Sequence, residues 1–259
     1  MATYEPFEAA PPQIANDLSL SDLWAALASG WGDFRARPAY GLFFGGVFVA
    51  SGVIVSFLLF DRGAIAWLIP FVAGFPILAP FTAVGLYEIS RRREAGIAMS
   101  WAAILTALKG RGDDQILSMG VILFVAFGFW VIVAHAIFSI AIVEAGAGSE
   151  SLAFLTTQTG IIMLVTGSAV GAIIALAFYA ITVFSLPMLV DRKVDFLTAI
   201  ITSLSTFRRN LSVLLVWALL IAVSLFASMI PAFLGLLVVL PVLGHATWHL
   251  YRRALTDIS

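Results

Sequence analysis

The chain has no cysteine among its 259 residues, and only 11% of them are charged. Without cysteine it forms no disulfide, binds no metal through thiolates and has no cysteine nucleophile. The scarcity of charge excludes an ordinary soluble domain, in which about a quarter of the residues are charged. The two signs nearly balance, at a formal net charge of −1, so the basic excess of a nucleic-acid-binding protein is also lacking.

The sequence also lacks the short motifs of common enzymes. It contains no phosphate-binding loop, no G-x-S-x-G, no H-E-x-x-H and no paired carboxylates. No carboxylate falls in the middle of a predicted membrane span, where ion pumps and ion-coupled transporters often need one. We therefore assign no catalytic residue, no metal ligand and no cofactor, and an enzyme is the less favoured class.

Apolar residues are abundant, at 61% of the chain, and the mean hydropathy is +1.05. A soluble domain cannot hide so many apolar side chains, because its surface has to stay polar. The sequence therefore predicts an all-α, polytopic membrane bundle with six transmembrane helices in one domain over residues 18–259. The predicted spans are approximately 40–60, 64–89, 115–143, 160–190, 210–230 and 232–251.

The segments outside the spans divide into a tail and three amphipathic helices. Residues 1–17 are acidic and proline-rich, which predicts a disordered cytoplasmic tail and no cleavable signal peptide. Residues 99–108 and 195–207 are predicted to be amphipathic helices at the membrane interface, on the cytoplasmic side. A third such helix has apolar residues at spacings of three and four, namely Leu20, Leu23, Trp24, Leu27, Trp31 and Phe34. Its two tryptophans favour the headgroup layer.

Small residues and repeated segments suggest how the helices are arranged. Gly41-x-x-x-Gly45 predicts a close helix-packing face in the first span. The segments LWAALASG (23–30), SWAAILTA (100–107) and FLTAIITS (196–203) each precede two predicted spans, and the second span of each pair carries a proline: Pro80, Pro187 and Pro241. The pattern indicates a three-fold repeat of one amphipathic helix and one hairpin. The alternative is that any amphipathic helix before a hairpin looks like this.

The basic residues are distributed unevenly around the predicted spans. Of the 14 Lys and Arg residues, only Arg62 falls on the opposite side from the others. Cytoplasmic loops are enriched in Lys and Arg, so both termini are predicted to be cytoplasmic. The basic rim is also a candidate site for anionic lipid headgroups, at Arg91, Arg92, Arg93, Arg192, Lys193, Arg252 and Arg253. The positive-inside bias alone would produce the same rim.

Five residues near this rim are candidates for binding a ligand or a partner: Tyr87, Glu88, His245, Trp248 and His249. His245 and His249 are four apart, and this spacing suits a pair of metal or haem ligands. The structural alternative, which we favour, places Trp248 and His249 at the membrane interface and His245 in a hydrogen bond between helices. Glu88 either pairs with an arginine one turn later or forms a proton or cation site at the cytoplasmic mouth.

Several motifs resemble those of a known family: GWGDFRARP (30–38), GLYEISRRREAG (85–96), SW (100–101), PMLVDR (187–192) and PVLGHATWHLYR (241–252). In these the chain resembles, over about residues 20–255, the bacterial integral membrane proteins of domain of unknown function 2189. The resemblance implies a multi-span protein of the inner membrane. It implies no activity, cofactor or catalytic residue.

Two functions are consistent with these features. The first is a non-enzymatic accessory, assembly or scaffold component of a membrane complex, favoured by abundant glycine and aromatic residues and by the missing reaction motifs. The second is a passive transporter or carrier of a small apolar or lipid-like solute, favoured by the prolines and the repeat. The expected partners are membrane lipids and another membrane protein, not nucleic acid. A water-accessible cavity near Pro80, Pro187 and Pro241 would favour the carrier.

Overall fold

The computed structural model describes residues 12–63, 67–68, 71–72, 79, 83–109, 114–145 and 152–256. Over these residues the chain is almost entirely helical, which confirms the predicted all-α class. Its α-helices are α1 (Leu20–Ala36), α2 (Pro38–Asp61), α4 (Val84–Glu94), α5 (Trp101–Leu105), α6 (Gln115–Ala145), α7 (Gln158–Asp191), α8 (Phe196–Arg209), α9 (Leu211–Met229) and α10 (Leu236–Ala254). Two short 3-10 helices, η2 (Thr106–Lys109) and η3 (Leu152–Thr156), follow α5 and precede α7.

Among the described residues, four helices are long and apolar enough to cross a membrane: α2, α6, α7 and α9. They correspond to the predicted spans 40–60, 115–143, 160–190 and 210–230. Much of the predicted span 64–89 lies outside the described residues, and its last part belongs to the 11-residue helix α4. The predicted span 232–251 corresponds to α10, whose second half carries histidine, tryptophan and arginine side chains. Six spans are therefore not confirmed.

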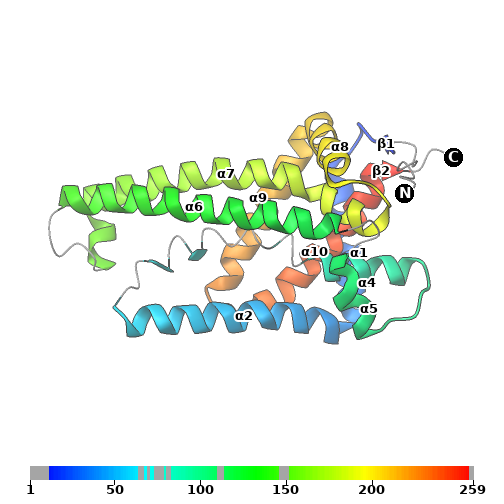
Figure 1. Ribbon diagram of the computed structural model, residues 1–259, viewed down its shortest axis with the longest axis horizontal. Coiled ribbons are helices and arrows are strands. Elements are labelled where there is room, and N and C mark those ends of the chain that lie inside the picture. Colours follow the sequence, from blue (N-terminus) through cyan, green and yellow to red (C-terminus); the bar gives the residue numbers. More distant parts are fainter. Residues whose placement is uncertain are drawn as a thin grey trace, which may run out of the picture.

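The helices form an elongated bundle. Figure 1 shows α6 and α7 along one long side and α2 along the opposite side, with α9 and α10 between them. α6 and α7 pack against each other, and α10 contacts α1, α2, α4, α7 and α9. The helices α1, α4, α5 and α8 gather at one end. We call this the basic end, because α1, α4, α8 and α10 each finish there with arginine in or just after the last turn.

Glycines let α1 and α2 approach the backbone of α10 closely. Gly41, Gly45 and Gly52 of α2 are buried, and a Cβ atom at Gly45 would lie 2.8 Å from the carbonyl oxygen of Leu236. The packing face predicted from Gly41 and Gly45 is thus confirmed. Gly30 plays the same part in α1, where a Cβ atom would lie 2.6 Å from the main-chain nitrogen of Ala246 in α10.

Helix α1 buries only part of its predicted apolar stripe. Leu23 and Phe34 are buried, on a helix that contacts α10, whereas Trp24 is 68% exposed and Trp31 45%. The two tryptophans lie on a second apolar face that the described chain leaves uncovered. The predicted position in the headgroup layer stays a prediction for this face.

Hydrogen bonds hold the N-terminal segment at the basic end. Strand β1 (Gln13–Ile14) pairs antiparallel with β2 (Leu255–Thr256), next to the end of α10. The side-chain amide of Asn210 donates to the carbonyl oxygen of Ala15 at 2.7 Å. Gln13 and Ile14, which belong to the tail predicted over residues 1–17, thus have main-chain partners in the C-terminal segment, and the disordered tail stays a prediction. Residues 1–11 lie outside the described residues.

The three segments of the predicted repeat are helical but unequal. α1 has 17 residues and α8 has 14, whereas α5 has 5 and continues as a 3-10 helix. Part of the hairpin that would follow α1 lies outside the described residues. The three-fold repeat stays a prediction.

Candidate functional site

A buried carboxylate, Asp33 of α1, lies at the centre of a polar cluster at the basic end. Its side chain is 3% exposed. Oδ2 accepts a hydrogen bond from Ser90 Oγ of α4 at 2.6 Å and lies 2.9 Å from Nε2 of His249 in α10. Oδ1 forms an ion pair with Arg93 of α4. Three helices that are distant in sequence thus meet at one carboxylate.

His245 extends this cluster into the protein. It is buried, and its Nδ1 lies 2.8 Å from Ser90 Oγ. Because Ser90 gives its single hydroxyl proton to Asp33, His245 carries its own proton on Nδ1 and donates it to Ser90. This is the hydrogen bond between helices that the structural alternative expected for His245.

The cluster keeps Asp33 ionised. Burial alone raises the pKa of a carboxyl group, but the hydrogen bonds from His249 and Ser90, with the charges of the nearby histidines, outweigh it and lower the pKa of Asp33 to about 2. A buried charge is stable only where donors surround it. We infer that Asp33 fixes α1, α4 and α10 relative to one another.

Glu88 forms the ion pairs that one of its two alternatives predicted. Its Oε2 accepts from Arg91 Nε at 2.7 Å, and its Oε1 accepts from Arg92 Nε at 2.6 Å. Glu88 is buried, so the two guanidinium groups satisfy a carboxylate that water hardly reaches. Whether it also serves as a proton or cation site stays a prediction.

Trp248 lies inside the protein rather than at its surface. It is 1% exposed, and its Nε1 donates to Oε2 of Glu94 at 3.0 Å. The membrane-interface position expected for Trp248 stays a prediction, because burial in the protein does not fix its depth in the membrane. The side chain of His249, one residue later, is 25% exposed.

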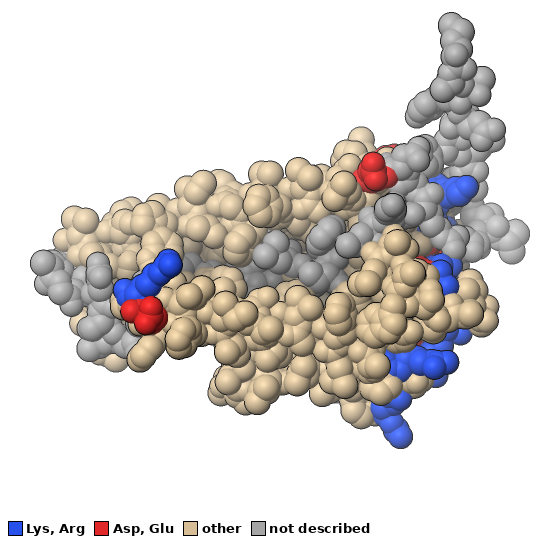
Figure 2. Space-filling model, turned by 60° about the horizontal axis from the view of Figure 1, so that its bottom comes forward, with Lys and Arg blue, Asp and Glu red and all other residues tan. Residues whose placement is uncertain are grey.

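Most of the basic residues proposed to hold anionic lipids are already paired with carboxylates. Figure 2 shows the basic residues gathered at one end of the molecule, opposite the end where α2 finishes at Arg62. The ion pairs join Arg91 and Arg92 to Glu88, Arg93 to Asp33, Arg192 to Asp191, Arg252 to Asp191 and Glu94, and Arg253 to Asp17 and Asp22. Among the described residues, those at this end without an ion pair are Arg35, Arg37, Lys193, Arg208 and Arg209.

The pairing of His245 and His249 as metal or haem ligands stays a prediction. No group of three or more His, Cys, Asp or Glu side chains there is arranged to hold a metal ion. His245 and His249 each contact a protein partner, Ser90 and Asp33 respectively. Those contacts use one nitrogen of each ring.

Asp33 and Ser90 belong to the cluster but were not among the candidate residues predicted from the sequence. Asp33 follows Gly30 by three residues and Ala26 by seven, which places it on the buried face of α1. A carboxylate on a helix face lined by small residues was the available signal. The predicted stripe followed the tryptophans instead.

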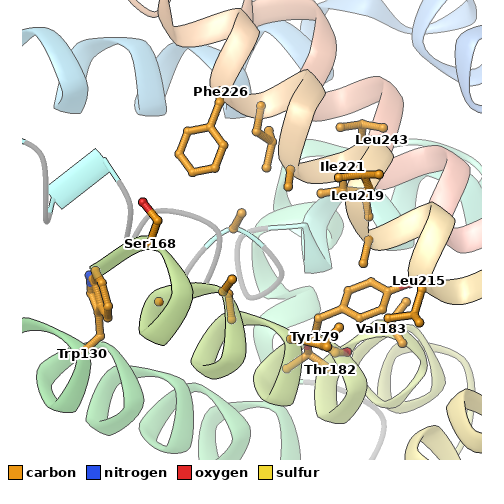
Figure 3. A pocket seen from close by; sticks show the side chains of 18 of the residues that line it. Trp130, Ser168, Tyr179, Thr182, Val183, Leu215, Leu219, Ile221, Phe226 and Leu243 are labelled. Atoms are coloured by element: carbon orange, nitrogen blue, oxygen red, sulfur yellow. The ribbon is translucent and has the colours of Figure 1, made fainter. Parts of the chain in front are cut away.

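The second feature is an apolar cavity of about 520 Å³, which Figure 3 shows from close by. Residues of α4, α6, α7, α9 and α10 line it. Small residues such as Gly167 and Ala218 leave the space, and larger apolar ones such as Trp130 and Phe226 bound it. None of the described lining residues is charged. Small-molecule sites in proteins are typically of this size.

The cavity lies where the sequence placed the prolines. Ala79 precedes Pro80, Val183 lies one turn before Pro187, and Leu240 and Leu243 flank Pro241; all four line the cavity. Tyr87, one of the candidate residues, lines it too. The other candidates belong to the polar cluster and its neighbours. The structure thus divides the predicted site residues between two features.

These features define an integral membrane protein whose helical bundle contains an apolar cavity as well as a polar cluster. The model of a family described as a predicted integral membrane protein, domain of unknown function 2189 (DUF2189), matches residues 68–191. This confirms the resemblance carried by the motifs over 85–96, 100–101 and 187–192. The motifs over 30–38 and 241–252 lie outside the match, and there the resemblance stays a prediction. No curated protein and no solved structure matches the chain.

Proposed function

We propose that this protein binds a small apolar or lipid-like molecule in the cavity and carries it without a chemical reaction. The observation that supports the proposal is the cavity itself, which lies beside Pro187 and Pro241 and offers room for a ligand. Its described lining residues include no acid, base or histidine. What the cavity offers a ligand is shape, apolar contact and a few hydroxyl groups.

The membrane position we propose has six spans, a bacterial inner membrane and both termini in the cytoplasm. Supporting it are the arginines at the ends of α1, α4, α8 and α10 and the place of Arg62 at the other end of α2. A phosphatase and a fluorescent reporter fused in turn after Ser259 test the orientation. We expect fluorescence without phosphatase activity, and the reverse pattern would contradict the topology.

A pair of glycine variants tests ligand binding. Gly167 lines the cavity and Gly128 does not, and a Cβ atom at either would meet nothing within 4 Å. Both positions therefore accept a larger side chain, but only Gly167→Phe fills the cavity. Native mass spectrometry of protein purified in mild detergent should show a bound lipid-like molecule in the wild type and in Gly128→Phe.

The same molecule should be missing from Gly167→Phe. An equal amount bound to Gly167→Phe and to the wild type would contradict the proposal, since the cavity would then not be the site. The melting temperature of each variant, measured in the same detergent, checks that both are folded.

An accessory role is the second candidate, favoured by the outer face of α6. Phe124 and Phe129 are exposed there on either side of Gly128, which is the arrangement of aromatic and small residues that a neighbouring membrane helix could cover. A second protein retained at fixed stoichiometry in the same mass spectra, and lost in Gly128→Phe, would support this role.

A further inference from the structure

The ends of the cavity differ in polarity. α6 runs away from the basic end and α7 returns toward it, so Phe138, Met163 and Leu164 lie at the far end, and Ser168, one turn further along α7, is the hydroxyl-bearing lining residue nearest to them. The hydroxyl-bearing residues Tyr179 and Thr182 lie within the last four turns of α7, near the basic end. From Met163 to Tyr179 the helix rises about 24 Å, a length that suits an extended acyl or isoprenoid chain.

The polar end collects hydroxyl groups from three helices that contact one another: α4, α7 and α10. Tyr179 and Thr182 share one side of α7, as Figure 3 shows, and donate to the carbonyl oxygens of Leu214 and Phe178 at 3.0 and 2.7 Å. Thr247 of α10 donates within its own helix in the same way. Each of these hydroxyls has used its proton, so each can only accept a hydrogen bond.

Tyr87 of α4 is different from these three. It lines the same cavity and is 3% exposed, yet its hydroxyl makes no hydrogen bond to any part of the chain that the structure describes. The residue as a whole is buried, but its hydroxyl opens on the cavity, where an apolar wall of described residues offers it no acceptor. A ligand with an oxygen acceptor at its polar end would satisfy it.

A charged headgroup does not fit this end. None of the described lining residues is charged, and the nearest arginines along α4, Arg91 and Arg92, are both paired with Glu88. Burying a phosphate or carboxylate without a counter-charge costs more than the hydrogen bonds here return. Since lipid tails match the cavity walls in polarity, the hydrogen bonds at the head have to provide selectivity.

We infer that the ligand is a neutral amphipathic lipid, with a hydroxyl or carbonyl group beside Tyr87 and a long apolar chain reaching toward Met163. Its polar oxygen accepts from the Tyr87 hydroxyl, and a hydroxyl head also donates to Tyr179, Thr182 or Thr247. This inference rests on the proposed function, because it concerns the same cavity.

The test is a native mass-spectrometric titration of the purified full-length protein with three lipids in mild detergent. Dioleoylglycerol offers a hydroxyl head, decylubiquinone offers carbonyls, and dioleoylphosphatidylglycerol offers a charged phosphate on the same acyl chains as dioleoylglycerol. We expect at least one neutral lipid to bind more than tenfold more tightly than the phospholipid. Tighter binding of dioleoylglycerol would indicate a hydroxyl head, and tighter binding of decylubiquinone would indicate a carbonyl head.

Tyr87→Phe removes only the unpartnered hydroxyl and keeps the ring. It should weaken binding of the preferred neutral lipid by about tenfold, the effect of one lost hydrogen bond in a buried site. It should leave the melting temperature of the empty protein unchanged or higher. Tyr40→Phe is the control, because Tyr40 packs on Trp101 outside the cavity.

The possible failures are distinct. Equal binding of the phospholipid, or wild-type affinity in Tyr87→Phe, would overturn the neutral-head inference while Gly167→Phe still abolishes binding. If none of the three lipids binds, or if all bind Gly167→Phe as they bind the wild type, the proposed function itself fails.

Discussion

Replacing Asp33 with alanine should destabilise the protein far more than replacing an exposed carboxylate. The substitution leaves Ser90 and His249 without their acceptor, and Ser90 is the partner of His245. Hydrogen bonds to a charged group contribute about 1.5–3 kcal/mol each. The Arg93 side chain is 44% exposed, so its ion pair adds little after solvent screening. The donors from Ser90 and His249 give a loss of about 3–5 kcal/mol in unfolding free energy.

The assay is equilibrium unfolding in mild detergent with increasing dodecyl sulfate, and tryptophan fluorescence reports the fraction unfolded. Asp61→Ala is the matched control, because Asp61 is exposed at the end of α2 and its change should stay within about 0.5 kcal/mol. A loss below about 1 kcal/mol for Asp33→Ala would refute the reasoning. The hydrogen bonds at Asp33 would then contribute nothing to holding α1, α4 and α10 together.

Three further predictions follow from named contacts. The pKa of Asp33 is lowered from 3.8 to about 2, so its stabilisation is lost as the pH falls from about 4 toward 2, and the difference in unfolding free energy between wild type and Asp33→Asn should shrink over that window. Gly30→Ala forces a Cβ atom against the backbone of α10 and should cost about 1–3 kcal/mol in the same unfolding assay, whereas Gly46→Ala, with nothing within 4 Å, should be neutral or stabilising by up to about 1 kcal/mol. Asn210→Ala removes the hydrogen bonds to Leu18 and Ala15 and should speed amide hydrogen exchange at the β1–β2 pairing severalfold, without changing exchange in the middle of α6.

The apolar runs of the sequence predicted the long helices well, because four of these runs are close to the length that is needed to cross a bilayer. Residues 115–143 and 160–190 became α6 and α7 with small changes at their ends. α10 was harder to interpret. Its second half is surrounded by other helices, so Trp248 is buried although its neighbours in sequence are polar. Which side of a helix meets protein depends on its tertiary partners.

The candidate site could be predicted only in part, for the same reason. The motifs around Glu88 and His245 led to the polar cluster, and the ion pairs of Glu88 follow from spacings of three and four along one helix. Asp33 lies 57 residues before Ser90 on a different helix, so no spacing along the sequence indicates that the two side chains meet. The cavity has no sequence signal, because its walls are ordinary alanine, glycine and aromatic residues contributed by five helices.

The most direct test of the central claim is photo-cross-linking from within the cavity in intact cells. Phe226 lines the cavity, with its ring directed into it in Figure 3, and p-benzoylphenylalanine is a close match for its shape. Phe124 on α6, 72% exposed and outside the cavity, is the control position. We predict that position 226 captures one discrete lipid-like molecule while position 124 captures the mixture of bulk membrane lipids. The same mixture at both positions would contradict the account, because the cavity would then be open bilayer rather than a binding site.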